Sequence, residues 1–297
     1  MRVAFAQAII AQYKDDPSAF FLTGDLGFMA LEEVRESLGP RFVNMGVSEQ
    51  NMVGVAAGLA REGLKPFVYS IAPFCYARPY EQIRNDICFG QLSVCLVGNG
   101  GGYAYGYMGP THHALEDCAA MNALGVRVLV PAFDDDLPTL ISHIHGPTYL
   151  RLGYDARPKG ATVEPYAAWR KVLPGDHGIL LALGPLAGVA WEALQGLPKE
   201  WRPAVWAVCE LPFGDVPVEI LAVIASGQAV YIVEEHVAAG GLGMQFSLAL
   251  ATRACVPASF NHRHASGHAV REFGSQAFHR AQCGLDVGGI LAMVEGT

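Results

Sequence analysis

Several kinds of pattern are missing from this sequence, and each absence excludes a class of protein. No run of basic residues occurs, and the 20 Lys and Arg are outnumbered by 28 Asp and Glu, for a net charge of -8. This balance argues against a nucleic-acid partner. No apolar run approaches the length needed to span a bilayer, so we expect a soluble protein with no membrane partner. Small molecules or other proteins are the expected partners.

The seven cysteines are an odd number, are widely scattered and include no Cys-x-x-Cys pair. Such spacing indicates neither a disulfide framework nor a zinc site. Most of them lie in apolar runs such as Val94-Cys-Leu-Val97, and buried thiols of this kind are typical of a reducing cytosol. We therefore expect a cytoplasmic protein and assign no metal ligands to this chain.

Short β-branched runs alternate with longer helical patterns along the 297 residues, 52% of which are apolar. The strand candidates of the first part are residues 20–23, 42–43, 65–69, 93–97, 126–130 and 147–151. Those of the second part are residues 178–183, 204–208 and 229–234. Such alternation predicts an α/β protein with two doubly wound domains, a mostly parallel one followed by a smaller one. The turn-rich segment 154–160 separates them, so we expect domains at 1–156 and 165–297.

Glu49 stands in the segment Met45-Gly-Val-Ser-Glu-Gln-Asn-Met52, where a short apolar strand runs into the first turn of a helix. Read alone, an acidic residue there is ordinary, because unpaired amides and the positive end of the helix dipole favour it. Ser48 is expected to cap this helix, and Gly63 to end it.

One face of the same helix is nearly bare of side chains, because Gly54, Ala57 and Gly58 lie on it. A bare face lets another backbone or helix approach closely. Tight packing inside one subunit and contact with a second subunit explain it equally well.

A glycine-rich segment, residues 97–113, follows a buried strand and so is expected at the carboxyl edge of the sheet, where ligands bind. It contains neither the dinucleotide spacing Gly-x-Gly-x-x-Gly leading into a helix nor the Walker lysine, so we do not interpret it as a phosphate cradle. On composition alone, it is a flexible loop whose tyrosines pack over the sheet edge. His112 and His113 are adjacent, and adjacent residues seldom both face one site.

Segments 46–52, 56–60 and 63–66 together resemble the pyrimidine-binding half of transketolase and of deoxyxylulose-phosphate synthase. In that family the glutamate matching Glu49 is the activating acid of thiamine diphosphate, so Glu49 is the expected catalytic and cofactor-binding residue. Gly109-Pro-Thr-His112, followed by Glu116-Asp117, resembles the family segment whose histidine reaches the substrate's carbonyl or hydroxyl oxygen. The resemblance therefore implies that His112 is catalytic and substrate-binding.

Two further segments carry the same resemblance. Residues 69–84 are similar to the family's serine-threonine-phenylalanine stretch, and Phe74 falls where an aromatic ring stacks on the cofactor's pyrimidine. Core packing is the alternative role for Phe74. Leu22-Thr-Gly-Asp25-Leu26 resembles a family segment near the cofactor, which implies that Asp25 and Leu26 are cofactor-binding.

The expected substrate site departs from the family pattern. Met108 stands where sugar-phosphate transketolases have an aspartate that hydrogen-bonds to a substrate hydroxyl. Those enzymes also have a histidine that contacts phosphate, and the corresponding position here is about Gly100. Arg151 falls where the family has an arginine for the same phosphate, so part of the anion site is expected to remain. Loss of a hydrogen-bonding group usually changes substrate preference. We expect an unusual substrate, such as a modified or carrier-linked sugar, or pyruvate as donor.

The resemblance extends over the whole chain. Residues 233–243 are typical of the family's C-terminal domain, and residues 271–274 resemble its closing segment. Nothing matches the family's diphosphate-binding domain, whose glycine-aspartate-glycine motif and asparagine hold magnesium. We therefore expect one subunit of a split enzyme, whose partner supplies the diphosphate and magnesium site in an α2β2 heterotetramer.

The expected activity is transfer of a two-carbon ketol unit with thiamine diphosphate, which needs a dry cleft around Glu49, such as one between two subunits. An alternative is the beta subunit of a 2-oxo acid dehydrogenase-type decarboxylase, although its histidine normally stands in a glutamine-histidine-serine setting. A non-catalytic regulatory subunit is the other alternative. Retention of Glu49, Phe74 and His112 together speaks against it.

Overall fold

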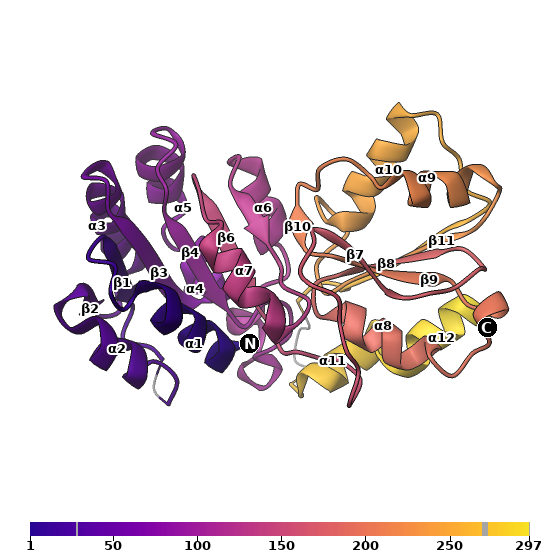
Figure 1. Cartoon of the computed structure of the whole chain (residues 1–297), viewed down its shortest axis with the longest axis horizontal. Coiled ribbons are helices and arrows are strands. Elements are labelled where there is room, and N and C mark those ends of the chain that lie inside the picture. Colours follow the sequence, from indigo (N-terminus) through magenta and orange to yellow (C-terminus); the bar gives the residue numbers. More distant parts are fainter. Residues whose placement is uncertain (28, 269–272, 297) are drawn as a thin grey trace.

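Two mostly parallel sheets, each with helices on both faces, make up the computed structural model, which describes residues 1–27, 29–268 and 273–296 (Figure 1). The seven-stranded sheet contains β1 (Ala19–Thr23), β2 (Phe42–Asn44), β3 (Lys65–Ile71), β4 (Cys95–Asn99), β5 (Arg127–Leu129), β6 (Thr148–Leu152) and β10 (Glu210–Leu211). The five-stranded sheet contains β7 (Trp169–Leu173), β8 (Ile179–Leu183), β9 (Ala204–Val208), β11 (Val230–Glu234) and β12 (Phe260–His264). The predicted fold class is confirmed.

The strand orders are β10-β5-β6-β4-β3-β1-β2 in the first sheet and β12-β11-β8-β9-β7 in the second. All neighbouring strands are parallel except β10 with β5 and β7 with β9, which are antiparallel. Each of the nine expected strands is present, with ends shifted by no more than two residues. The strands that the sequence did not reveal are β7, β10 and β12. They lie at sheet edges, where half-exposed strands carry polar residues and lose the apolar signature of buried ones.

Helices cover the first sheet on both faces. On one face lie α1 (Arg2–Tyr13), α2 (Glu32–Leu38) and α7 (Leu137–Ser142), and on the other lie α3 (Glu49–Arg61), α4 (Ala72–Tyr76) and α6 (Asp117–Ala123). Because successive strand residues point to opposite faces, Phe67 and Tyr69 of β3 pack with the first group while Val68 packs with the second. Burial on both faces explains why the central strands read as continuous apolar runs.

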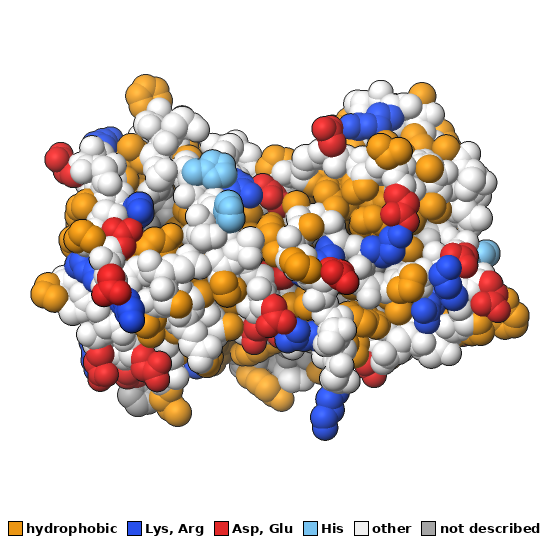
Figure 2. Space-filling view, in the orientation of Figure 1, with side chains coloured by type: hydrophobic (Ala, Val, Ile, Leu, Met, Phe, Trp, Pro, Cys, Tyr) orange, Lys and Arg blue, Asp and Glu red, His pale blue; other side chains and the backbone are white. Residues whose placement is uncertain are grey.

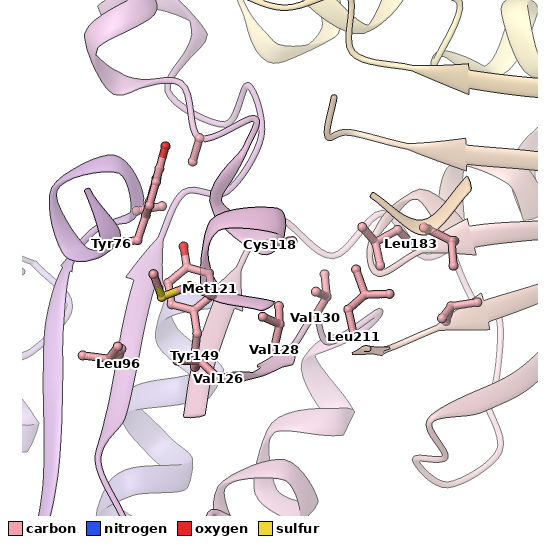
Figure 3. Close-up of a cluster of buried hydrophobic side chains, with 14 of the residues drawn as sticks. Tyr76, Leu96, Cys118, Met121, Val126, Val128, Val130, Tyr149, Leu183 and Leu211 are labelled. Carbon is pink, nitrogen blue, oxygen red and sulfur yellow. The ribbon is translucent and has the colours of Figure 1, made fainter. Parts of the chain in front are cut away.

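The second sheet repeats this arrangement. Helices α8 (Leu186–Leu194) and α12 (Val287–Glu295) pack on one face, and α9 (Val218–Ala225) and α10 (Leu242–Thr252) pack on the other. One apolar cluster continues from the α3 side of the first sheet to the α9 side of the second. Figure 3 shows Val128 and Val130, from the first half of the chain, close to Leu183 and Leu211, from the second half. The two halves of the chain therefore share a core.

The short strand β10 strengthens this connection. It belongs by sequence to the second half of the chain, yet Leu211 pairs with Val128 and Glu210 with Leu129 at the edge of the first sheet. Arg127 forms an ion pair with Glu210 across the same edge. The first sheet is thus completed by residues from within the segment 165–297.

Acidic and basic side chains are interspersed over the face seen in Figure 2, which also shows an indentation between the two lobes at its upper edge. All seven cysteines are free thiols, and five of them are buried. Within the described residues, no helix combines the length and the apolar character needed to cross a membrane.

Strands β1, β2, β3 and β4 are parallel and adjacent, so their carboxyl ends meet at one edge of the first sheet. Each of the segments singled out in the sequence follows one of these ends. Asp25 and Leu26 follow β1, Glu49 follows β2, Phe74 follows β3, and the glycine-rich loop with His112 follows β4. This edge is where open α/β sheets bind ligands.

Candidate functional site

Glu49 is the first residue of α3, and its side chain is 3% exposed. The hydroxyl of Ser70, near the end of β3, donates to Oε1 at 3.1 Å. Nη1 of Arg78 donates to Oε1 at 3.0 Å and to Oε2 at 2.9 Å. The loop after β1 also comes close, because a Cβ on Gly24 would lie 3.5 Å from Oε1. The carboxylate is therefore held in a fixed position, below the surface at the sheet edge.

The start of α3 differs from the prediction in one detail. Ser48 occupies the N-cap position and its backbone carbonyl accepts from the Met52 amide at 2.9 Å, but its hydroxyl donates to the Met45 carbonyl at 2.6 Å. The prediction of side-chain capping by Ser48 is wrong, because the turn before the helix offers a carbonyl acceptor to the same hydroxyl. Gly63 adopts a φ of +80° just after the helix, as the predicted stop requires.

Phe74 and Arg78 form the next part of the site. The guanidinium carbon of Arg78 lies 3.8 Å from the centroid of the Phe74 ring, a cation–π contact. Phe74 lies in α4, and Ala77 continues the helical conformation, so residues four apart share one side. Arg78 is 42% exposed, whereas the carboxylate to which it is bonded is buried.

His112 completes the cluster. Its ring lies edge-on to Phe74, with the ring centroids 5.1 Å apart. Nδ1 lies 2.9 Å from the hydroxyl oxygen of Thr111. Burial lowers the pKa of His112 below its usual value of 6.5, and the positive charge of Arg78 lowers it further. The imidazole is consequently neutral at pH 7 and carries one N–H.

His113 faces a different set of neighbours. It is buried, and its ring lies 5.1 Å from that of Tyr103 and 5.0 Å from that of His279, a residue of α11 (Gln276–Gln282). The two adjacent histidines thus face different surroundings, as the sequence argument anticipated. His112 is the one that lies beside Phe74.

Asp25 and Leu26 lie in the loop that approaches Glu49, but their own contacts run elsewhere. Asp25 is exposed, with a φ of +59°, and its carboxylate accepts from the side-chain amide of Asn44 at 2.8 Å. The carbonyl of Leu26 accepts from the Thr23 hydroxyl at 3.0 Å. Direct contact of Asp25 and Leu26 with a cofactor stays a prediction.

The glycine-rich loop is covered by the second half of the chain. A Cβ on Gly102 would come within 2.5 Å of Oε1 of Glu235, and one on Gly106 would come within 2.5 Å of the Gly274 carbonyl. The Tyr103 amide donates to the same Glu235 carboxylate at 2.6 Å. These glycines therefore allow close packing between the two halves. The loop therefore packs against protein groups, as expected for a segment that is not a phosphate cradle.

Arg151 has a buried guanidinium that is already engaged. Nε donates to Asp117 at 2.8 Å, and Nη2 donates to the carbonyls of Ala114 and Glu235 at 2.7 and 3.0 Å. Through these bonds, Arg151 connects the loop after β4 to both halves of the chain. Its contact with a substrate phosphate stays a prediction. Met108 is 58% exposed, so it is accessible to a ligand.

One group of side chains has the composition of a metal site, but its members have other partners. Asp117, Cys118 and His236 place possible metal-ligand atoms within 4.8 Å of one another. Arg151 is bonded to Asp117, and the Ala119 amide donates to Nε2 of His236, so both groups are in use. In the closing segment 271–274, Arg271 and Glu272 lie outside the described residues.

Comparison with known proteins identifies the family. The family described as "Transketolase, pyrimidine binding domain" matches residues 1–153. The chain belongs to the transketolase family. One subunit of the apulose-4-phosphate transketolase of Phocaeicola vulgatus is 30% identical over 254 residues, which are 82% of this chain and 80% of its own length. The 1-deoxy-D-xylulose-5-phosphate synthase of Clostridium perfringens is 26% identical over 249 residues, which are 80% of this chain but 40% of that enzyme.

Solved structures of transketolases have the same fold. One described as "Split gene transketolase, inactive beta4 tetramer" superposes with a TM-score of 0.83 at 28% identity, covering 99% of this chain and 97% of that one. Transketolase from Leishmania mexicana superposes with a TM-score of 0.78 at 20% identity, covering 99% of this chain and 45% of that one, a likeness of fold alone. The predicted resemblance to the pyrimidine-binding and C-terminal subunit of a split transketolase is confirmed.

Thiamine diphosphate dependence, which the transketolase family implies, can be tested against the geometry of the cluster. A flat group with N–H donors fits between the Phe74 ring and the Glu49 carboxylate, because the Arg78 guanidinium lies there. An aminopyrimidine ring is also flat and carries a ring nitrogen that can share a hydrogen bond with a carboxyl group. Glu49, Phe74 and Ser70 therefore suit the pyrimidine end of this cofactor.

Sequence reasoning missed Arg78 and Ser70. The spacing of four residues between Phe74 and Arg78 was a usable signal, since residues four apart meet on a helix. For Ser70 there was no signal beyond its position at the end of a strand, because its bond to Glu49 depends on how β3 packs beside α3.

Proposed function

We propose that this chain is the pyrimidine-binding subunit of a thiamine diphosphate-dependent, transketolase-like enzyme that transfers a two-carbon ketol unit to an aldehyde acceptor. The observation that carries the proposal is the cluster of Glu49, Phe74 and His112 at the carboxyl edge of the first sheet, in which Arg78 links Glu49 to Phe74. The relation to a subunit of apulose-4-phosphate transketolase supports it.

When bound, thiamine diphosphate would supply the nucleophilic carbon that two-carbon transfer needs. Glu49 holds a proton between its carboxyl group and the ring nitrogen that faces it, which activates the cofactor. Ser70 fixes the orientation of that carboxyl group through its hydrogen bond to Oε1. Phe74 holds the pyrimidine by ring stacking. Asp25 and Leu26 border the cofactor from the loop after β1.

His112 acts on the substrate side. Thr111 lies within hydrogen-bond distance of Nδ1, so Nε2 is the nitrogen that meets a substrate oxygen. A neutral imidazole with its proton on Nε2 donates to the oxygen on which negative charge develops, as an oxyanion donor does. Met108, exposed on the same loop, replaces a hydroxyl-reading aspartate, and we propose a substrate other than the common sugar phosphates.

A second polypeptide completes the site by binding the diphosphate and magnesium, in an α2β2 assembly. The bare face of α3 supports this part of the proposal. Among the described residues, nothing lies within 4 Å of a Cβ built on Gly54 or Gly58, and Val55 beside them is exposed. Ala57, which the sequence placed on the same face, is instead 2% exposed and packs into the core, so the part of the face at Gly54 and Gly58 is the part open to another polypeptide. The relative described as an inactive beta4 tetramer supports dependence on a partner.

We keep 1–156 and 165–297 as the proposed boundaries of the two domains. We also propose that the enzyme acts in the cytoplasm. The connection through β10 adds that the two domains act as one body, since the second supplies an edge strand to the first.

The decisive experiment is cofactor binding by the complex of this chain with its diphosphate-binding partner. We expect magnesium-dependent binding of thiamine diphosphate by calorimetry and no turnover by this chain alone. Glu49→Gln should lower turnover by about a hundredfold to ten-thousandfold, the usual loss of a positioned acid, while the fold is kept. Glu62→Gln, an exposed change at the other end of α3, is the matched control. Near-normal activity of the Glu49→Gln complex would rule out the proposal.

A further inference from the structure

Arg78 makes, with one side chain, the two contacts that an aminopyrimidine ring would make in this site. Its guanidinium donates to both oxygens of Glu49, at 3.0 and 2.9 Å, and its carbon lies 3.8 Å from the centroid of the Phe74 ring. Both the guanidinium and the pyrimidine are planar and carry at their edge a nitrogen that can hydrogen-bond to a carboxyl group. The carboxylate and the aromatic face cannot serve both groups at once.

On the basis of the proposed function, we propose that Arg78 is a built-in competitor of the cofactor, whose guanidinium occupies the pyrimidine position and must leave before the ring binds. Its position allows this movement. The side chain is 42% exposed while Glu49 is 3% exposed, so the arginine covers the carboxylate from the solvent side. A surface hollow lined by Val47, Ser48, Gln50 and Asn51 adjoins both residues and gives the displaced side chain room.

Displacement has a measurable effect on affinity. The apparent dissociation constant of a ligand equals its intrinsic value divided by the fraction of protein in the competent conformation. If Arg78 covers the site nine-tenths of the time, it weakens cofactor binding about tenfold. Charge-assisted hydrogen bonds between arginine and a carboxylate are strong enough to hold such a population.

A second consequence concerns His112. The Arg78 charge is one of the two causes that lower the pKa of His112, the first being burial. Departure of the guanidinium therefore raises this pKa toward 6.5, so the imidazole reports the position of Arg78 without any measurement of activity.

The first test is calorimetric titration of thiamine diphosphate and magnesium into the complex of this chain with its partner. We compare the unmodified chain with Arg78→Met, which keeps the length but removes the charge and the donors, and with Arg78→Lys, which keeps the charge but loses the flat fork. Arg84→Met, an exposed change a few residues away, is the control. We expect about tenfold tighter binding for Arg78→Met, an intermediate value for Arg78→Lys and no change for Arg84→Met. Equal or weaker binding by Arg78→Met would overturn the inference.

The second test follows the His112 imidazole by NMR in the full-length chain without cofactor. Arg78→Met should raise the pKa of His112, and Arg84→Met should leave it unchanged. An unchanged value in Arg78→Met would show that the arginine does not occupy the site, and would overturn the inference. If neither the unmodified nor the variant complex binds thiamine diphosphate, the proposed function itself fails. If the unmodified complex binds it and Arg78→Met binds it no more tightly, only the role of Arg78 fails.

Discussion

The imidazole ring of His112 stands edge-on against the ring of Phe74, with 5.1 Å between the ring centroids and 71° between the ring planes. Phe74 follows β3 and His112 belongs to the loop after β4, so the adjacent ends of two parallel strands bring them together. The contact joins the side chain proposed to hold the cofactor ring to the one proposed to meet the substrate oxygen.

Removing the imidazole should affect the chemical step more than cofactor binding. We expect His112→Ala to lower kcat by about a hundredfold to a thousandfold, the usual loss of one oxyanion donor, with little change in the Kd for thiamine diphosphate. Steady-state kinetics and calorimetry on the same complex measure the two effects. His145→Ala, which alters an exposed histidine, is the control. A variant that is defective in cofactor binding alone would contradict the role of His112.

Replacing the Phe74 ring should weaken cofactor binding more than it slows the chemical step. Phe74→Leu removes the stacking surface but keeps an apolar side chain, and aromatic contacts contribute about 0.5–1.5 kcal/mol beyond buried area. The Kd for thiamine diphosphate should therefore rise by about two- to tenfold, whereas Phe74→Tyr should bind almost normally. If Phe74→Leu loses thermal stability and keeps full cofactor affinity, Phe74 is a core residue, as the alternative interpretation held.

The open face of α3 predicts an effect on assembly. Leucine at Gly58 meets no described atom within 4 Å of its Cβ, so the chain itself should remain folded, and helix propensity should even improve by roughly 0.5–1 kcal/mol. The bulky side chain should block association with the partner. Size-exclusion chromatography with light scattering measures this. Gly288→Leu, at an equally open position in α12, is the matched control, and normal assembly of Gly58→Leu would show that this face is not an interface.

The contact between the glycine-rich loop and the second half should contribute to stability. Glu235 is buried, accepts from the Tyr103 amide and from Gln276, and pairs with Arg280. Glu235→Ala leaves that arginine without its partner, and breaking a buried pair costs about 3–5 kcal/mol.

Urea unfolding measures this loss. Glu219→Ala, which removes an exposed partner of Lys171, should cost no more than about 1 kcal/mol and is the control. A loss no larger for Glu235→Ala than for the control would mean that the two halves are held together by other contacts.

Acid stability should depend on Asp16. Hydrogen bonds from Ser18 and Lys65 lower the pKa of Asp16 from 3.8 to about 2. Because the pKa is depressed in the folded chain, the contribution is complete above about pH 4 and is lost as the pH falls through about 2. Asp16→Asn should flatten the pH dependence of unfolding in this window. The pair is near the surface, so the effect should be about 0–1 kcal/mol. If the stability of Asp16→Asn falls with pH between about 4 and 2 as steeply as that of the unmodified chain, the prediction is wrong.

The sequence was sufficient where a signal is local or belongs to a family motif. Apolar runs located the central strands, and the motif segments around Glu49, Phe74 and His112 lie together at one sheet edge. It was insufficient where a role arises from a contact between distant residues. The bond from Arg78 to Glu49 and the packing of Glu235 on Gly102 depend on how strands and domains meet.

The matched relatives also bear on the alternatives. The two relatives described above, a subunit of apulose-4-phosphate transketolase and a 1-deoxy-D-xylulose-5-phosphate synthase, agree with the Gly-Pro-Thr-His segment, which favours transketolase. A purely regulatory role would leave the geometry of Glu49, Phe74 and His112 unexplained.

The two residues of β10 have an implication for anyone who wishes to dissect this protein. A cut between the two domains would remove the strand that pairs with Val128 and Leu129. Their backbone amides and carbonyls would then lie unpaired at an exposed sheet edge. Exposed edge strands pair with other chains, so the amino-terminal fragment should precipitate or self-associate. The pyrimidine-binding half is best produced with its companion attached, and studies of cofactor capture should begin from the intact polypeptide.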